Sequence, residues 1–545
     1  MSMAMQASTT LFTNGRVFNA ARQKGEPSFY DWMLVEDGII KDIGHDSDAR
    51  LNDIKQNVSQ YHDLSAKTIL PGFIDGHLHL LLLGQSLQKL DLWGCQNFAD
   101  IRGRIKEYAA KHPNLPRIMC GGWMNFMTNG EAKASMLDDL DERPIFIDSR
   151  DLHSVWCNTA ALKEMDVDSM VVPPGGLVER DEQGKPSGLI GEACVLTHVW
   201  PHLARVASME EKTAALKAAI DVYTRAGYTG LTDMAMDINA WDAIMTLFKK
   251  QPETPMRISA YWFIAPTDDI TEAFIELEKA IQMTKEFDTS KSPNARILGI
   301  KLILDGVIDA CRAAVSQPYS SNGGLPEPLW KPEVVEAIVK KADEAGIQCA
   351  IHAIGDLAIS IAINAIEKYG TPGRRHRIEH LELSSPEDAK RLGKLGIIAS
   401  IQPVHSDPAI LRAWSHILGP ERLKRAFAYK EFHDHGAPLA IGTDTPTAPH
   451  LPFPNLYVAT TRKSAKEPEK NDEPVNPNFA LGIYDAIAGA TAGVAYSTFA
   501  DDRLGTLRPG QLADFVVVDM DFENPDTLVN TRVEQTWFGG RKVFG

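Results

Sequence analysis

Two histidines, His77 and His79, interrupt the otherwise apolar stretch ILPGFIDGHLHLLLLG. A buried imidazole needs a hydrogen-bond partner or a metal ion. The stretch is typical of a strand, in which residues i and i+2 point to the same side. Two imidazoles on one side can bind a single metal ion. A pair of core histidines bonded to the backbone would explain the spacing equally well.

A second H-x-H pair, His433 and His435 in EFHDHGAP, shows how little the spacing says by itself. This pair lies at the end of a helix-like segment, where positions i and i+2 do not face the same way. We therefore expect the second pair to lie outside any metal site.

Four further titratable residues lie within apolar, strand-like segments or at their ends. They are Lys301 in GIKLILDG, His352 in CAIHAIGD, His380 in HRIEHLE and Asp444 in AIGTDTP. Each is costly to bury without a partner. Taken singly, each has a structural explanation, such as a satisfied core histidine or an ion-paired lysine. Together with the first histidine pair they make six groups, and one shared site would explain all six.

A recurring unit in the second half of the chain would position these groups. A helix-like segment ends at a glycine and a short apolar strand follows, around Gly227, Gly346, Gly396 and Gly436. The first such helix begins at Ser208, with Glu211 as its capping-box partner. Repeated units of this kind predict a parallel α/β architecture, and about eight strands fit a (β/α)8 TIM barrel. Active sites of such barrels lie at the carboxyl ends of the strands, where the six groups fall.

The rest of the chain predicts additions to this barrel. Residues 1–70 and 500–545 are β-rich with Asn-Gly and Asp-Gly turn signals, so we expect them to pair into a flanking β-sandwich. Residues 71–499 would form the barrel. Within them, 85–205 break the β/α rhythm and are expected to form an inserted subdomain near the barrel mouth. The segment NFALGIYDAIAGATAGVAYS is expected to form a helix or a helix pair under the barrel.

Composition narrows the functional classes. The 545 residues exceed one ordinary core, and 44% hydrophobic with 23% charged residues is typical of a globular protein. The net charge of −16 and the absence of a long basic block predict no nucleic-acid partner. The apolar runs are far shorter than the roughly 20 residues that cross a bilayer, so no membrane association is expected. Six scattered cysteines and no secretory signal predict a cytoplasmic location.

Seven motifs follow one another along nearly the whole chain. They are LPGFIDGHLHLLLLG, DLHSVWCNTAAL, IKLILDGVIDACRAAVSQPY, GIQCAIHAIGDLAI, RHRIEHLE, IGTDTPTAPHLPF and LGTLRPGQLADFVVVDMD. In this order they resemble the amidohydrolase superfamily, and more closely its YtcJ-like branch, the amidohydrolase 3 group that includes N-substituted formamide deformylases. The resemblance implies a small-molecule substrate, a split β-sandwich beside the barrel and a homodimer.

The resemblance also implies a set of metal ligands. His77 and His79 would bind the more buried ion, and His352 and His380 the second. Lys301 would carry a carbamate formed from CO2 that bridges the two ions, because a plain ammonium has no acceptor for a cation. An ion-paired lysine beside a single ion is the alternative. Asp444 would touch the first ion and the attacking water. This donor set suits one or two Zn²⁺ ions per chain, with iron, manganese or cobalt as alternatives.

The implied reaction is the hydrolysis of an amide or formamide C–N bond. Zinc lowers the pKa of its bound water towards about 7, which supplies a metal-bound hydroxide, and Asp444 would pass a proton to the leaving nitrogen. An isomerisation, a decarboxylation, a retro-aldol cleavage or an ester hydrolysis stays open, because a Lewis acid also stabilises enolates. A non-catalytic scaffold is the third reading, although such proteins usually lose their ligands.

Candidates for substrate contact come from the segments that resemble those of the family. His153 in DLHSVWCN would contact the substrate or stabilise an oxyanion, together with Trp156; the alternative is that both anchor the inserted segment. Trp123 in GGWMNF corresponds to a tryptophan near the mouth in the family.

Further positions fill out the expected pocket. Tyr319 and Gln402 are candidate pocket residues, and Gln402 directly follows the seventh predicted strand. Met124 and Ala313 stand where relatives often carry more polar residues, which suits a partly hydrophobic substrate. Asp356 in HAIGD is expected to be a helix N-cap rather than a catalyst.

Overall fold

A computed structural model describes residues 8–20, 28–150, 154–173, 176–192, 194–267, 269–470 and 473–545. The chain divides into two compact units, each described here by itself. The first unit comprises residues 1–80, 220–238 and 248–545, and the second comprises 81–219 and 239–247. The domain boundaries expected from the sequence stay predictions.

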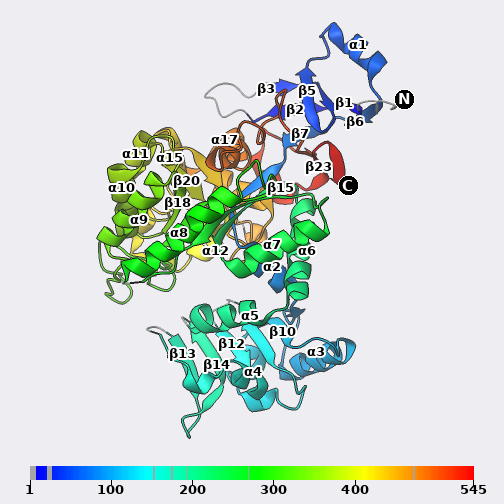
Figure 1. Ribbon diagram of the computed structural model, residues 1–545. Coiled ribbons are helices and arrows are strands. Elements are labelled where there is room, and N and C mark those ends of the chain that lie inside the picture. The colour runs from blue at the N-terminus through cyan, green and yellow to red at the C-terminus, as the bar shows by residue number, and fades with distance from the viewer. Residues whose placement is uncertain are drawn as a thin grey trace. The chain divides into compact units, whose positions relative to one another are not determined.

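The first unit contains one parallel sheet of eight strands, in the order β21-β20-β19-β18-β17-β16-β15-β8. The strands are β8 (Phe73–Leu78), β15 (Tyr228–Met236), β16 (Arg257–Phe263), β17 (Ala295–Ile303), β18 (Gln348–Ala353), β19 (Arg377–His380), β20 (Ile398–Ile401) and β21 (Leu439–Ile441). Beyond β21 the chain turns back to β8, where the Asp444 N–H donates to the His77 carbonyl at 2.7 Å and the His79 N–H to the Thr445 carbonyl at 2.9 Å. The sheet is therefore a nearly closed barrel, as predicted (Figure 1).

Glycines end the helices that precede four of these strands. Gly227, Gly346, Gly396 and Gly436 have φ values of +95°, +83°, +65° and +87°. Residues with a side chain rarely adopt this left-handed conformation, whereas glycine adopts it freely at a helix end. The helices include α9 (Pro332–Glu344) and α11 (Pro386–Leu395), and the chain enters a strand within three residues of each glycine. The predicted helix–glycine–strand units are confirmed.

Helix starts confirm one prediction and correct another. At α6 (Met209–Arg225) the Glu211 N–H donates to Ser208 Oγ at 3.1 Å, and the Ser208 N–H donates to Glu211 Oε2 at 2.7 Å, so the capping box is confirmed. At α10 (Asp356–Tyr369) the N-cap is Gly355, so the prediction for Asp356 is wrong. The Asp356 carboxylate instead accepts hydrogen bonds from the backbone N–H and the hydroxyl of Ser316, which lies on the loop after β17.

Both chain ends contribute to two further sheets of the first unit. One has the order β5-β4-β1-β6 and the other β24-β23-β22-β7-β2-β3. Their strands are β1 (Thr9–Thr13), β2 (Arg16–Asn19), β3 (Ser28–Tyr30), β4 (Trp32–Glu36), β5 (Ile39–Gly44), β6 (Gln60–Asp63), β7 (Thr68–Pro71), β22 (Phe515–Val518), β23 (Val533–Phe538) and β24 (Arg541–Phe544). Amino-terminal β7 pairs with carboxyl-terminal β22, so the blue and red strands of Figure 1 lie side by side.

One apolar cluster joins these two sheets. It buries Phe12 and Met33 from the four-stranded sheet together with Phe515 and Trp537 from the six-stranded one. Strand β7 also continues through Gly72 directly into β8, the strand that carries His77. The terminal sheets are thus covalently continuous with the barrel strand that opens the candidate site.

A helix pair, α17 (Ile483–Gly489) and α18 (Ala492–Ser497), follows the barrel, as predicted. Val494 and Ala495 of α18 pack in one buried cluster with Ile74 of β8 and Ile398 of β20. Both of these strand residues lie at amino-terminal ends, so α18 covers the end of the barrel opposite the candidate site.

The second unit has a mixed sheet of its own, in the order β13-β14-β12-β11-β10-β9. Its strands are β9 (Leu90–Asp91), β10 (Ile118–Trp123), β11 (Ile145–Ser149), β12 (Ser154–Cys157), β13 (Gly176–Arg180) and β14 (Pro186–Glu192). Helix α3 (Phe98–Lys111) supplies Ile101 and Ile105 to its core, which also buries Trp123 and Trp156.

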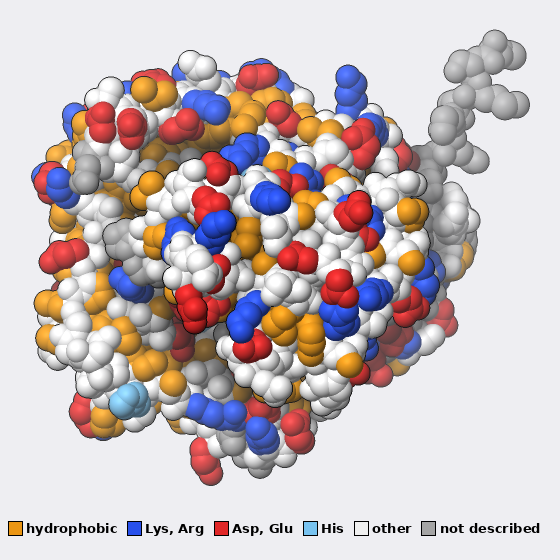
Figure 2. All heavy atoms as spheres, turned by 90° about the horizontal axis from the view of Figure 1, so that it is seen from below, with side chains coloured by type: hydrophobic (Ala, Val, Ile, Leu, Met, Phe, Trp, Pro, Cys, Tyr) orange, Lys and Arg blue, Asp and Glu red, His pale blue; other side chains and the backbone are white. Residues whose placement is uncertain are grey.

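The surface of the described residues does little to narrow the kinds of partner that the protein could bind. None of the described helices combines the length and the apolar composition needed to cross a membrane. On the face drawn in Figure 2, acidic, basic and apolar side chains are interspersed. The absence of nucleic-acid and membrane partners stays a prediction.

Candidate metal centre

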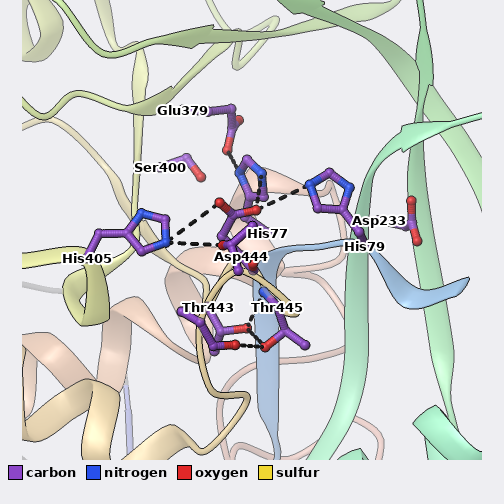
Figure 3. Close-up of polar contacts among 12 residues, drawn as sticks. His77, His79, Asp233, Glu379, Ser400, His405, Thr443, Asp444 and Thr445 are labelled. Atoms are coloured by element: carbon purple, nitrogen blue, oxygen red, sulfur yellow. Dashed lines mark hydrogen bonds and ion pairs between the residues drawn. The ribbon is translucent and has the colours of Figure 1, made fainter. Parts of the chain in front are cut away.

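The opening histidine pair meets one carboxylate at the carboxyl end of the barrel strands. His77 is the second-to-last residue of β8, His79 lies just beyond the strand, and Asp444 follows β21. The Asp444 Oδ1 atom lies 3.4 Å from His77 Nε2 and 3.2 Å from His79 Nε2 (Figure 3). The i, i+2 spacing thus directs both imidazoles to the same oxygen atom.

A network beneath Asp444 holds its loop against β8. Asp444 has a left-handed φ of +57°, and its N–H is bonded to the His77 carbonyl. The preceding residue, Thr443, donates its N–H and its hydroxyl to the Asp75 carboxylate at 3.0 and 2.6 Å. Asp75 also accepts a hydrogen bond from the Tyr223 hydroxyl at 3.0 Å. A strained backbone conformation supported in this way is common at functional sites.

Three further predicted groups come from the strands on the other side of the barrel. The His380 ring centroid lies 4.9 Å from that of His77 and 4.3 Å from that of His352. Lys301 of β17 is 2% exposed. His77, His380 and Asp444 each offer a ligand atom within 4.8 Å of the others, which is close enough to share one ion.

Unsatisfied polar atoms show that the imidazoles of this group fit a bound cation. Within the described part of the chain, Lys301 Nζ, His352 Nε2 and His380 Nδ1 are buried and have no hydrogen-bond partner. The nearest carboxylate oxygen to His352 Nε2 is Oδ1 of Asp305, at 3.5 Å. Buried polar atoms of this kind are normally bonded, and several together indicate a ligand or an ion.

Burial sets the protonation states that a metal site requires. It lowers the pKa of His77 to about 4, with the Lys301 charge adding to the shift, and it holds the pKa values of His352 and His380 well below their ordinary range. These imidazoles are therefore neutral at pH 7 and able to bind a cation. Burial alone would raise the pKa of Asp444, but His77 and His79 outweigh it and keep the group ionised.

The sequence analysis missed a buried ion pair behind His77. The Glu379 carboxylate accepts a hydrogen bond from His77 Nδ1 at 2.7 Å and is paired with Arg377 Nε at 2.5 Å. The Arg377 Nη2 atom also donates to the Gly76 carbonyl and to Ser400 Oγ. Such a carboxylate fixes the tautomer of a ligating histidine and leaves Nε2 free for the metal. The available signal is R-x-E within a buried strand, since i and i+2 share a face.

His405 was also missed, and it reaches Asp444 from a short helix, Pro403–Ser406. Its Nε2 lies 3.7 Å from Asp444 Oδ2 and its Nδ1 lies 3.7 Å from Glu382 Oε1. The ring is parallel to that of His380 at a centroid distance of 6.0 Å. His380, Glu382 and His405 form a second group whose ligand atoms could share an ion.

The expected substrate contacts lie in different surroundings. Gln402 is 1% exposed, and within the described residues neither of its amide atoms has a hydrogen-bond partner. The Tyr319 hydroxyl donates to the Ala313 carbonyl at 3.1 Å. Trp123 and Trp156 pack together in the core of the second unit, with ring centroids 5.5 Å apart. Their contact with a substrate stays a prediction.

One expected contact falls outside the described part of the chain. His153 belongs to the segment 151–153, which lies outside the described residues, so its contact with the substrate stays a prediction.

Comparison with known proteins identifies the family. The sequence pattern of the amidohydrolase family matches residues 60–544. The chain belongs to the amidohydrolase family. Putative amidohydrolase YtcJ of Bacillus subtilis is 28% identical over 94% of this chain and 95% of its own length. The N-substituted formamide deformylase of Arthrobacter pascens is 25% identical over 90% of each chain. These similarities place the chain in the YtcJ-like branch of this family.

Similarity extends to a plant protein and to solved structures. The protein LONG AFTER FAR-RED 3 of Arabidopsis thaliana is 29% identical over 98% of this chain and 91% of its own length. A metal-dependent hydrolase structure from Pyrococcus horikoshii has a TM-score of 0.79 and 24% identity, and covers 95% of this chain and 99% of the other. The fold is therefore that of the amidohydrolases. Family membership and the His/Asp cluster together identify a metal-dependent hydrolase.

Proposed function

We propose that this amidohydrolase cleaves the C–N bond of a small, partly hydrophobic amide, with an N-substituted formamide as the first substrate class to test. The observation that carries the proposal is the set of unpartnered buried atoms on Lys301, His352 and His380 beside the His77–His79–Asp444 group. The similarity to an N-substituted formamide deformylase supports the substrate class.

The donor set of the proposed centre suits Zn²⁺. His77, His79 and Asp444 would hold one ion, and His352 and His380 a second. A divalent cation held there would polarise the substrate carbonyl and lower the pKa of a water molecule.

Lys301 would join the centre as a carbamate. Burial lowers its pKa to about 8, so roughly a tenth of the side chain is neutral amine at pH 7. The neutral nitrogen attacks CO2 and releases one proton, which leaves an anionic carbamate with two oxygen ligands. The amine state that this reaction requires is therefore accessible near neutral pH.

Asp444 is the residue proposed to move the proton. It is ionised, its Oδ1 faces both histidines, and its Oδ2 lies 3.7 Å from His405. Its carboxylate would accept the proton of the attacking water and deliver it to the leaving nitrogen, which departs as an amine. Gln402, with an unpartnered amide group next to the strand end, would bind the substrate amide.

The test is hydrolysis of a panel of N-alkyl and N-arylalkyl formamides and acetamides by zinc-loaded protein, read as released amine. Asp444→Asn keeps the size of the side chain and should lower kcat by about 10²- to 10⁴-fold, the range for loss of a general acid–base group. The matched control His435→Gln changes the second H-x-H pair and should keep wild-type kcat. Full activity in Asp444→Asn would overturn the proposed proton transfer.

The isotope content of the product checks the reaction type. In ¹⁸O-labelled water, one labelled oxygen should enter each carboxylate product. An amine-releasing reaction without label would show that the site works by a non-hydrolytic route.

A further inference from the structure

A small cavity lies at the end of the barrel opposite the metal centre. Its volume is about 20 Å³, and it is lined by residues near the starts of β8, β15, β16 and β17 and by the segment 498–504 that follows α18. A cavity needs roughly 10–15 Å³ of such space to hold one water molecule. This one therefore has room for one water-sized group, such as a water molecule or a single oxygen atom of a larger ion.

Three arginines line this cavity. Arg257 is ion-paired with Asp514. Among the described residues, Arg296 bonds only to neutral oxygens: Ser259 Oγ at 3.2 Å, Thr289 Oγ1 at 3.1 Å and the Thr498 carbonyl at 2.6 Å. The Arg503 guanidinium has no hydrogen bond or ion pair with any other residue that the structure describes. Each guanidinium has five N–H donors, so two remain on Arg296 beyond its three hydrogen bonds, and most remain on Arg257 and Arg503.

Positive charge is in excess around the cavity. The carboxylates that oppose the three guanidiniums are Asp514, already paired with Arg257, and the exposed Asp502. Burial, reinforced by repulsion from Arg503, lowers the pKa of Arg296 to about 10. Burying a cation without a partner is costly, and the rest of this chain is strongly acidic, with a net charge of −16. Arg296 is 5% exposed and has no carboxylate partner among the described residues, whereas Arg503 is partly exposed, so an anion here would offset mainly the charge of Arg296.

The donor geometry indicates what that partner is. Guanidinium groups present paired N–H donors that match the oxygens of a phosphate or a sulfate. Arg257 and Arg296 belong to barrel strands, whereas Arg503 belongs to the segment after α18. An anion between them would connect this segment to the barrel.

We propose that the cavity binds one small inorganic oxyanion, of the phosphate or sulfate class, which bridges Arg257, Arg296 and Arg503 and stabilises segment 498–504 beneath the barrel. This site is separate from the metal centre and does not depend on the reaction catalysed there.

The test is thermal unfolding of the zinc-loaded protein in a low-salt buffer with 0–10 mM phosphate, and again with sulfate, at ionic strength held constant with sodium chloride. We expect a Tm increase that saturates, because the anion binds the folded state. General salting effects require far higher concentrations and do not saturate. Isothermal titration should give one anion per chain. A wild-type Tm that does not respond to either anion would overturn the proposal.

Variants of Arg503 locate the site. Arg503→Gln should lose the phosphate-dependent Tm increase and weaken the apparent Kd at least tenfold, while Arg503→Lys should retain part of it. Without phosphate, Arg503→Gln should unfold at or above the wild-type temperature, since one repelling charge is gone. The variant would thus be the more stable protein without phosphate and the less stable one with phosphate. An arginine that only supported the fold would lower the Tm in both conditions when replaced.

The matched control is Lys390→Gln, which removes one positive charge from the exposed face of α11 and should keep the full increase. If Arg503→Gln also kept the full increase, the anion would be bound elsewhere, for example at the metal centre, and the proposal would be wrong.

Discussion

At the scale of single residues, Glu379 sets the orientation in which the His77 ring would bind a metal ion. The carboxylate holds Nδ1 at 2.7 Å and so directs Nε2 towards Asp444. Glu379 is itself held by Arg377, and both side chains are fully buried. Removing either partner leaves an uncompensated charge in the core, which is far more costly than removing both.

We expect Glu379→Gln to weaken zinc binding by about 10- to 100-fold, the usual effect of losing the carboxylate behind a ligating histidine. Zinc retention during dialysis against a graded chelator measures this effect. The variant should also lose about 3–5 kcal/mol of stability, because Arg377 is left without its partner.

The double variant Arg377→Met/Glu379→Gln separates these two effects. Its free energy of unfolding should recover towards wild type while zinc binding stays weak. If zinc binding recovered together with stability, Glu379 would act only through folding, contrary to the role given to it here.

Sequence reasoning reached the candidate ligands but not the residues behind them. His77, Lys301 and His352 could be found because each is a titratable group in an apolar strand. Glu379 precedes His380 directly, and regular alternation puts neighbours on opposite faces of a strand. His380 has a left-handed φ of +75°, which breaks the alternation. No local sequence pattern predicts this left-handed conformation at His380.

At the scale of elements, the turn glycines are what make the barrel units compact. A Cβ atom at Gly396 would meet nothing within 4 Å, so only its φ of +65° requires glycine. The helix-to-strand rhythm was therefore readable from sequence. The N-cap of α10 was not, because Asp356 bonds to Ser316, a residue 40 positions earlier.

We expect Gly396→Ala to destabilise the protein by about 1–2 kcal/mol, the cost of a left-handed residue that carries a side chain. Gly103 is the matched control, because it lies within α3 with open space around it and no left-handed φ. Gly103→Ala should stabilise its helix by about 0.5–1 kcal/mol. Chemical denaturation of both variants measures whether each substitution lowers or raises the free energy of unfolding. A stabilising effect at Gly396 would contradict the backbone argument.

At the scale of the whole chain, the candidate ligands come from β8, β17, β18, β19 and the segment after β21. An ion bound by all of them would connect strands across the barrel, so binding and folding are linked. The order of elements made the barrel predictable. The division into two compact units was not, since α6 and α7 (Ile238–Lys250) run through the boundary without a break in the sequence pattern.

We expect removal of the metal by a chelator to lower the Tm, and zinc to restore it. At a free zinc concentration 100 times the Kd, the gain in unfolding free energy should be about 2.7 kcal/mol. Calorimetry with and without zinc measures it. His77→Gln should lose the zinc-dependent gain, whereas His433→Gln, from the second H-x-H pair, should keep it. Equal gains in both variants would show that zinc binds elsewhere.

The bonds between Asp75 and Thr443 span 368 residues of sequence, which has a consequence for protein synthesis. A ribosome makes the chain from its amino terminus, so the first histidine ligands emerge long before Asp444. Strand β7, which precedes the first histidine ligands, also pairs with β22, and β22 is made only near the end of synthesis. Until translation is almost complete, strand edges of the nascent protein stay unpaired and its metal site stays incomplete, and chains in such a state are prone to aggregation.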